Sequence, residues 1–112
     1  MITVSSARPG TPQRVRVAGD LDLPRGDDLE LRVRPMLVPG AQVALDLRDV
    51  EFADSSGIGA LLVLNQLAQD VGAELVLVDP SPVVRSVLDL TATIDLFTIA
   101  GRRKPPAHLR AS

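Results

Sequence analysis

The segment whose residue types and spacing point most clearly to a chemical role is Asp54-Ser55-Ser56-Gly57-Ile58-Gly59. They lie where a strand pattern gives way to a long apolar helical pattern, so two hydroxyls fall at a predicted helix N-terminus. The free N–H groups and the dipole at such a position favour negative charge. A serine there can therefore be a helix cap, a nucleophile or a phosphate acceptor.

The three roles differ in what else they require. Capping is common for Asp and Ser, because their oxygens accept hydrogen bonds from unpaired backbone N–H groups. A nucleophile needs a base and an orienting acid, but the only histidine is His108 near the C-terminus, and no Gly-x-Ser-x-Gly motif is present. A phosphate would be tolerated electrostatically at a helix start while changing the surface charge. The local pattern favours a cap and leaves the phosphate acceptor open.

Motifs for other chemistry are missing. There is no Walker-type phosphate loop, and Gly57-x-Gly59 lacks the third glycine of a dinucleotide loop. Without cysteine, any metal site would depend on carboxylates. Asp20, Asp22 and Asp54 could form a weak divalent site, but solvated turn carboxylates are commoner. We therefore expect no enzyme activity, no catalytic residues, no cofactor and no metal.

The composition describes a small protein with an aliphatic core. Apolar residues make up 46% of the 112 residues but aromatic residues only 2%, which suits branched side chains packed between helices and a sheet. The first residues lack the basic-apolar-small pattern of a signal sequence, so none is expected, and no apolar run approaches the roughly 20 residues that span a bilayer. The net charge of -2 gives little attraction to nucleic acid. We expect a cytoplasmic protein that binds neither nucleic acid nor membrane.

The last residues have a different character. The run Arg102-Arg103-Lys104 and Arg110 are basic, and Pro105-Pro106 interrupts any periodicity. Such a segment is typical of a frayed, solvated terminus. The predicted organisation is one domain over residues 1–101 and a flexible basic tail over 102–112.

Strand and helix patterns alternate along the chain. The predicted strands cover residues 2–4 and 15–18, which form a hairpin, and then 41–47, 74–78 and 94–99. A turn is expected at 19–22. The predicted helices cover about 26–37, then 55–71 with Gly72 as C-cap, and a segment from Pro82 capped by Ser81. The order β-β-α-β-α-β-α-β predicts an α/β fold, with helices packed on a mixed sheet.

The periodicity of the 55–71 helix predicts which side faces the sheet. One face gathers the apolar residues Ala60, Leu61, Leu64, Leu67, Ala68 and Val71. Ile58 and Leu62 fall on the opposite side with Ser55. They can form a small exposed contact patch beside the serine, or a loop or helix of the same domain can cover them. The sequence leaves both possibilities open.

Taken together, several segments resemble the STAS family, and within it the bacterial anti-sigma factor antagonists of the sporulation and general-stress type. The resemblance covers residues 3–99. Its anchors are Val17-Ala18-Gly19-Asp20-Leu21-Asp22, similar to a Gly-Glu-Leu-Asp turn; residues 43–47; residues 52–59, similar to the phosphorylation loop; and residues 80–90 with 95–97, similar to the last helix and strand. Asp20 replaces the commoner glutamate, and the region of the first helix lacks the usual Thr-Ala-x-x-Leu pattern.

The resemblance implies a phosphorylation switch. In that family an anti-sigma factor that is itself a serine kinase phosphorylates the first serine of the Asp-Ser-Ser-Gly motif, which is Ser55 here. The unmodified antagonist binds the kinase and frees a sigma factor, the phosphorylated form lets go, and a phosphatase resets it. Partner contacts are then expected at Asp20, Asp22, Asp54, Ser56, Gly57, Ile58 and Leu62.

A second hypothesis is a STAS module that works without a sigma factor. It would be an interaction subunit of a larger assembly, such as a lipid-transport or stress-sensing complex. A third, an enzyme or nucleotide-binding protein, is disfavoured by the missing base and phosphate loop.

Overall fold

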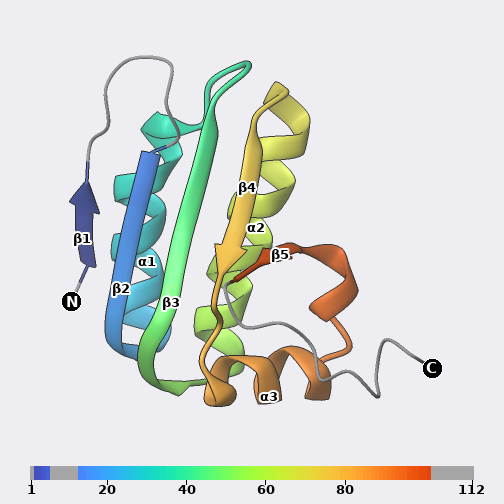
Figure 1. Ribbon diagram of the computed structural model, residues 1–112. Coiled ribbons are helices and arrows are strands. Elements are labelled where there is room, and N and C mark those ends of the chain that lie inside the picture. Colours follow the sequence, from blue (N-terminus) through green and yellow to red (C-terminus); the bar gives the residue numbers. More distant parts are fainter. Residues whose placement is uncertain (1, 6–12, 102–112) are drawn as a thin grey trace.

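A five-stranded mixed sheet forms the centre of the computed structural model, which describes residues 2–5 and 13–101 (Figure 1). The strands are β1 (Ile2–Ser5), β2 (Gln13–Leu21), β3 (Gln42–Ala53), β4 (Glu74–Val78) and β5 (Thr98–Ala100), and they lie in this order across the sheet. β1 runs antiparallel to β2, whereas the other neighbours are parallel. The predicted mixed sheet and the pairing of the first two strands are confirmed.

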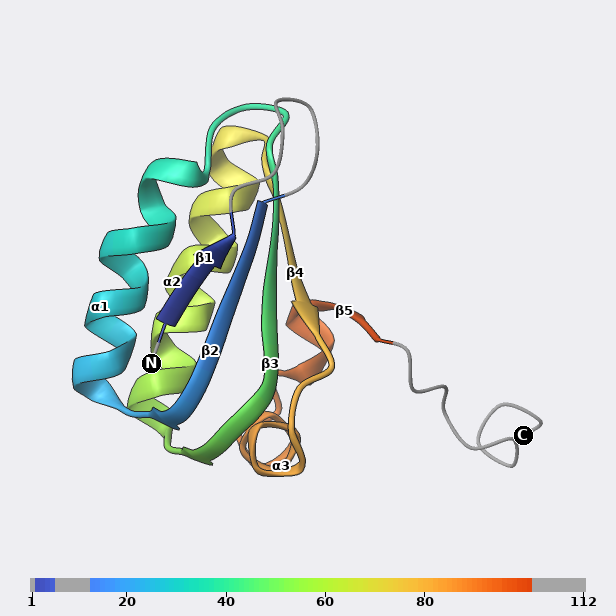
Figure 2. The same cartoon turned by 60° about the vertical axis from the view of Figure 1, so that its left-hand side comes forward.

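Three helices complete the α/β fold in the predicted order. They are α1 (Leu23–Val33), α2 (Ser55–Val71) and α3 (Pro82–Leu90), with short 3-10 turns η1 (Arg34–Met36) and η2 (Ile94–Leu96). α1 and α2 lie side by side on one face of the sheet, and α3 lies near the end where β3 finishes (Figure 2). Gly72 ends α2 in the left-handed conformation, and Ser81 caps α3, both as predicted.

The core lies between the sheet and the helices, and it is aliphatic. Its fully buried side chains come from β2, β3 and β4 on one side and from the helices on the other; the largest are Leu21, Leu29, Leu45, Leu47, Ile58, Leu61, Leu64, Leu77 and Leu88. Phe97, which is 8% exposed, is the only aromatic core residue in the described ranges. Branched side chains fill such a layer well.

The chain between the second strand and the first helix differs from the prediction. β2 continues through residues 19–21, which were expected to form a turn. Gly19 permits this because its φ of 86° accommodates an irregular register with β3. α1 then begins at Leu23 rather than near residue 26, since Asp22 caps it and Pro24 fits its first turn.

Three other boundaries differ. The α-helix stops at Val33 and continues as η1, which contains Pro35, a residue without the N–H needed to extend the helix. β3 runs on to Ala53, six residues beyond its predicted end, because its pairing with β2 continues. The last strand is only Thr98–Ala100, since residues 94–96 turn into η2.

Within the described part of the chain, no helix is both long and apolar enough to cross a membrane. The loop of the predicted hairpin and the predicted basic tail over 102–112 lie outside the described residues.

Candidate functional site

Two neighbouring parallel strands end at the same edge of the sheet, and each leads directly into a helix. Leu21 at the end of β2 pairs with Ala53 at the end of β3. The backbone N–H of Asp54 donates to the carbonyl oxygen of Leu21 over 3.2 Å. Asp22 and Asp54, which follow these strands, therefore start two helices at one edge. We call this region the carboxyl edge, and it consists of residues 20–23 and 52–59.

Both aspartates are N-caps. Oδ1 of Asp22 accepts a hydrogen bond from the backbone N–H of Arg25 (3.2 Å), and Oδ1 of Asp54 accepts one from that of Gly57 (3.0 Å). Because Asp54 occupies the cap, Ser55 and Ser56 are the first two residues of α2, and both are exposed. Neither serine hydroxyl bonds to any residue that the structure describes. The capping role considered for these serines belongs to Asp54.

Gly57 lets the start of α2 sit directly on the end of β2. A Cβ at this position would lie 2.1 Å from the carbonyl oxygen of Leu21, far inside contact distance. On the neighbouring helix, a Cβ at Gly26 would lie 2.9 Å from the Cβ of Ala60 and 3.6 Å from the Cα of Gly57. These close approaches hold the first turns of α1 and α2 side by side.

Of the two possibilities left open for Ile58 and Leu62, the exposed contact patch is wrong. Ile58 is 1% exposed, and Leu62 is partly buried against the core. With Asn65 they form one stripe of α2, at spacings of four and three residues. The side-chain amide of Asn65 donates to the carbonyl oxygen of Leu96 over 2.9 Å, so the segment after α3 lies along this stripe. The alternative, that the same domain covers these residues, is correct.

The remaining predicted residues lie at the carboxyl edge. Asp20 is exposed and pairs with Phe52 across β2 and β3. Asp22 and Asp54 are half-buried, Ser56 is exposed, and Gly57 is buried. Their roles in partner binding stay predictions.

Sequence reasoning missed two large exposed apolar side chains at this edge. Leu23 is 58% exposed and Phe52 is 48% exposed. The exposure of Leu23 could have been predicted from its position between the capping Asp22 and Pro24. That position puts Leu23 in the first turn of a helix and away from the core.

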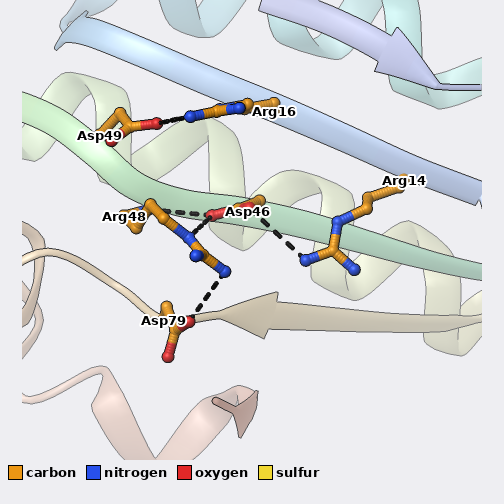
Figure 3. A network of polar contacts seen from close by, with 6 residues as sticks. All are labelled: Arg14, Arg16, Asp46, Arg48, Asp49 and Asp79. Atoms are coloured by element: carbon orange, nitrogen blue, oxygen red, sulfur yellow. Dashed lines mark hydrogen bonds and ion pairs between the residues drawn. The ribbon is translucent and has the colours of Figure 1, made fainter. Parts of the chain in front are cut away.

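Charged side chains are paired in a different place, on the sheet face turned away from α1 and α2 (Figure 3). The buried carboxylate of Asp46 contacts Arg14 and Arg48, and Arg48 also contacts Asp79 (3.0 Å). Burial opposes the ionisation of Asp46, but hydrogen bonds from the backbone and guanidinium of Arg48 outweigh it and lower the pKa of Asp46. Asp49 forms an ion pair with Arg16 and raises the pKa of that guanidinium.

The polar groups at the carboxyl edge are hydroxyls and carboxylates. In the described ranges no three His, Cys, Asp or Glu side chains are grouped so that they could hold a metal ion. The only histidine, His108, lies outside those ranges. What the edge offers is exposed hydroxyls at a helix N-terminus, flanked by carboxylates.

Comparison with known protein families identifies the domain. The family model described as "Mlab, STAS domain" matches residues 4–96. This chain belongs to the STAS domain family. The carboxyl edge is therefore part of a STAS domain, and the resemblance noted in the sequence is confirmed.

Three named proteins are similar in sequence to this STAS domain. The anti-sigma-B factor antagonist of Bacillus subtilis is 26% identical over 89 residues, covering 80% of this chain and 82% of that protein. The anti-sigma F factor antagonist of Paenibacillus polymyxa is 28% identical over 87 residues, covering 76% and 74%. A STAS-domain containing protein of Pseudomonas aeruginosa is 27% identical over 99 residues, covering 88% and 98%.

Solved structures share the fold. The unphosphorylated form of the anti-sigma factor antagonist SpoIIAA has a TM-score of 0.72 at 20% identity, covering 100% of this chain and 98% of that one. The phosphorylated form of the Bacillus cell fate determinant SpoIIAA has a TM-score of 0.70 at 19% identity, with both chains fully covered. The mixed sheet with three helices is thus the fold of these proteins.

Proposed function

We propose that this protein is an anti-sigma factor antagonist that binds an anti-sigma factor serine kinase and is switched off by phosphorylation of Ser55. Two of its relatives are named as antagonists of anti-sigma factors, and a structural neighbour has been solved in a phosphorylated form. The observation that carries the proposal is the Ser55 side chain. It is exposed at the first position of α2, and its hydroxyl is bonded to no described residue.

A phosphate at this position is compatible with the fold. Asp54 already caps α2 through the N–H of Gly57, so the fold does not depend on the hydroxyl of Ser55. The helix N-terminus also favours negative charge. Phosphorylation therefore changes the surface and leaves the packing beneath it in place.

The same phosphate would release a partner. It adds about -1.5 to -2 charge next to the carboxylates of Asp22 and Asp54, on an edge that exposes Leu23. Docking a partner here would require removal of water from that charge, which is costly where apolar groups meet. The unmodified protein thus binds the kinase in the cytoplasm and frees a sigma factor. A phosphatase acting on phosphorylated Ser55 restores binding. The protein itself performs no catalysis.

The acceptor can be tested directly. Each purified anti-sigma factor serine kinase of the source organism is incubated with ATP and the wild-type protein, and phosphorylation is read by intact mass. We expect Ser55→Ala to abolish the added phosphate, and the matched variant Ser56→Ala to retain it. Labelling of Ser55→Ala at the wild-type level would show that the acceptor is a different residue.

The release mechanism needs a separate measurement. We expect Ser55→Asp to weaken binding to the kinase by about tenfold or more, since an unpaired buried charge costs more than the 1.4 kcal/mol that corresponds to a factor of ten. Calorimetry of kinase binding provides the affinity. Equal affinities of Ser55→Asp and wild type would refute release by charge.

A second function is favoured by one observation. The matching family model is described by "Mlab, STAS domain" and not as an antagonist, so the protein could be an interaction subunit of a larger assembly, such as a lipid-transport or stress-sensing complex. Size measurement of the native complex separates the two functions. A large assembly without a serine kinase would favour this second function.

A further inference from the structure

Helix α1 exposes two large apolar side chains on its outer face. Leu23 is 58% exposed and Leu31 is 74% exposed. Asp27 lies between them at intervals of four residues and is also exposed. Such spacing puts all three residues on one side of the helix, while Gly26, Leu29 and Val33 are buried on the other. We call Leu23, Asp27 and Leu31 the outer stripe of α1.

The charges near the outer stripe are unbalanced. Arg32 of α1 pairs with Asp28, and Arg34 of η1 pairs with Glu30. The guanidinium of Arg25 donates to the neutral carbonyl oxygen of Ala18, and it takes part in no ion pair among the described residues. The carboxylates around the stripe and the carboxyl edge take part in none of the six ion pairs found among the described residues. They are Asp20, Asp22, Asp27, Glu51 and Asp54. This side of the molecule therefore presents apolar side chains among five unpaired carboxylates and the one unpaired guanidinium of Arg25, which leaves an excess of negative charge.

The outer stripe continues the surface that carries Ser55. Leu23 directly follows the cap Asp22 and lies one turn before Gly26. The N–H of Asp54 donates to the carbonyl oxygen of Leu21 over 3.2 Å, so α1, which begins at Leu23, and α2, which begins at Ser55, both start within two residues of this contact. A partner seated over the carboxyl edge at Ser55 can therefore also contact Leu23 and extend along α1 to Leu31.

We propose that the outer stripe of α1 is part of the docking surface for the anti-sigma factor, and that the partner meets it with an apolar surface bordered by Arg or Lys side chains. This inference rests on the proposed function. The excess of carboxylates argues for a basic partner, because opposite potentials across an interface favour encounter and fix the register. It also argues against a second copy of this chain, which would bring the same negative charges to the contact.

The two leucines would respond differently to phosphorylation. Leu23 belongs to the edge where the phosphate would be added. Leu31 is eight residues further along α1, which is about 12 Å at 1.5 Å per residue. This exceeds the screening length of about 8 Å at physiological ionic strength. The contact of Leu31 therefore supplies affinity that the phosphate leaves largely unchanged, whereas the contact of Leu23 is lost with phosphorylation.

The test measures binding of the purified anti-sigma factor serine kinases of the source organism to the full chain. We expect Leu31→Gln to weaken the affinity about tenfold or more, with unchanged thermal unfolding because the side chain is exposed. The matched control is Leu90→Gln on α3, where Leu90 is 85% exposed, and it should bind like wild type. Asp27→Asn should reduce the dependence of affinity on salt.

The outcomes separate this inference from the proposed function. If Ser55→Asp weakens binding but Leu31→Gln does not, and Asp27→Asn leaves the salt dependence of the affinity unchanged, the outer stripe is not part of the interface and the proposed function stands. If Leu31→Gln weakens binding by a similar factor in the wild-type and Ser55→Asp backgrounds, the separate contribution of Leu31 is supported. If wild type binds none of the kinases, both proposals are overturned.

Discussion

Gly57 and Gly59 are two residues apart in the first turns of α2, yet their surroundings are opposite. A Cβ at Gly57 would press against the backbone of Leu21, whereas a Cβ at Gly59 would meet nothing within 4 Å. The first glycine is required by packing. The second only costs helix stability, because glycine loses more backbone freedom on folding than alanine does.

We expect opposite effects on stability from the same substitution at these two positions. Gly59→Ala should raise the free energy of unfolding by about 0.5–1 kcal/mol. Gly57→Ala should lower it by about 2 kcal/mol or more, because the new methyl group forces the backbones of α2 and β2 apart. Chemical denaturation measures both. Destabilisation by Gly59→Ala would mean that this part of α2 is packed more tightly than the structure indicates.

Among the elements, β2 and β3 carry both the core and a charged outer face. Their inward side chains, such as Val15 and Leu45, are fully buried, while Arg14 and Asp46 alternate with them on the face shown in Figure 3. Asp46 is itself 5% exposed, so its carboxylate depends on its arginine partners. This network links β2, β3 and the end of β4 through Arg48 and Asp79.

The lowered pKa of Asp46 predicts how stability depends on pH. A carboxylate whose folded-state pKa is below its unfolded value stabilises the fold above the unfolded pKa of about 3.9. That contribution is lost as pH falls through the folded-state value. We expect the difference in unfolding free energy between wild type and Asp46→Asn to be constant from pH 6 to about 5 and to shrink below about pH 4. A difference independent of pH would show that Asp46 acts only through packing and neutral hydrogen bonds.

At the scale of the whole molecule, paired and unpaired charges occupy different sides. Ion pairs occur on the sheet face turned away from α1 and α2, and along the later turns of α1 and η1. The carboxylates of the carboxyl edge and the outer stripe form no ion pair among the described residues. The phosphate acceptor proposed here lies on the unpaired side, at the exposed start of a helix whose packing begins at Gly57. The switch would then act on the surface of a fold that stays intact.

Ser55→Asp tests whether the fold tolerates charge at this position. Negative charge in the first turn of a helix contributes about 0.3–1 kcal/mol, and 1 kcal/mol shifts the Tm of a domain of this size by about 4–8 °C. We therefore expect the Tm of the isolated variant to be unchanged or slightly raised relative to wild type and Ser55→Ala. A fall of more than about 5 °C would attribute weaker partner binding to loss of structure.

Much of the architecture was predictable because its signals are local. The α2 helix with Gly72 at its end, the Ser81 cap of α3 and the strand Glu74–Val78 all follow from hydrogen bonds and periodicity within a few residues. Predictions failed where a distant contact decides. Residues 19–21 extend β2 because β3 pairs with them. Residues 94–96 form η2, where the carbonyl oxygen of Leu96 accepts a hydrogen bond from the side chain of Asn65 on α2.

At the candidate site, the sequence by itself determined the Asp-Ser-Ser-Gly motif, the presence of a helix behind it and the family that it resembles. The tertiary structure alone decided that Asp54 is the cap, that both serines are exposed and that Ile58 is buried. Periodicity defines the faces of a helix but does not say how many neighbours cover them. Here the sheet, α1 and the segment ending at Leu96 all pack on α2. The exposed apolar side chains at the carboxyl edge are instead Leu23 of α1 and Phe52 of β3.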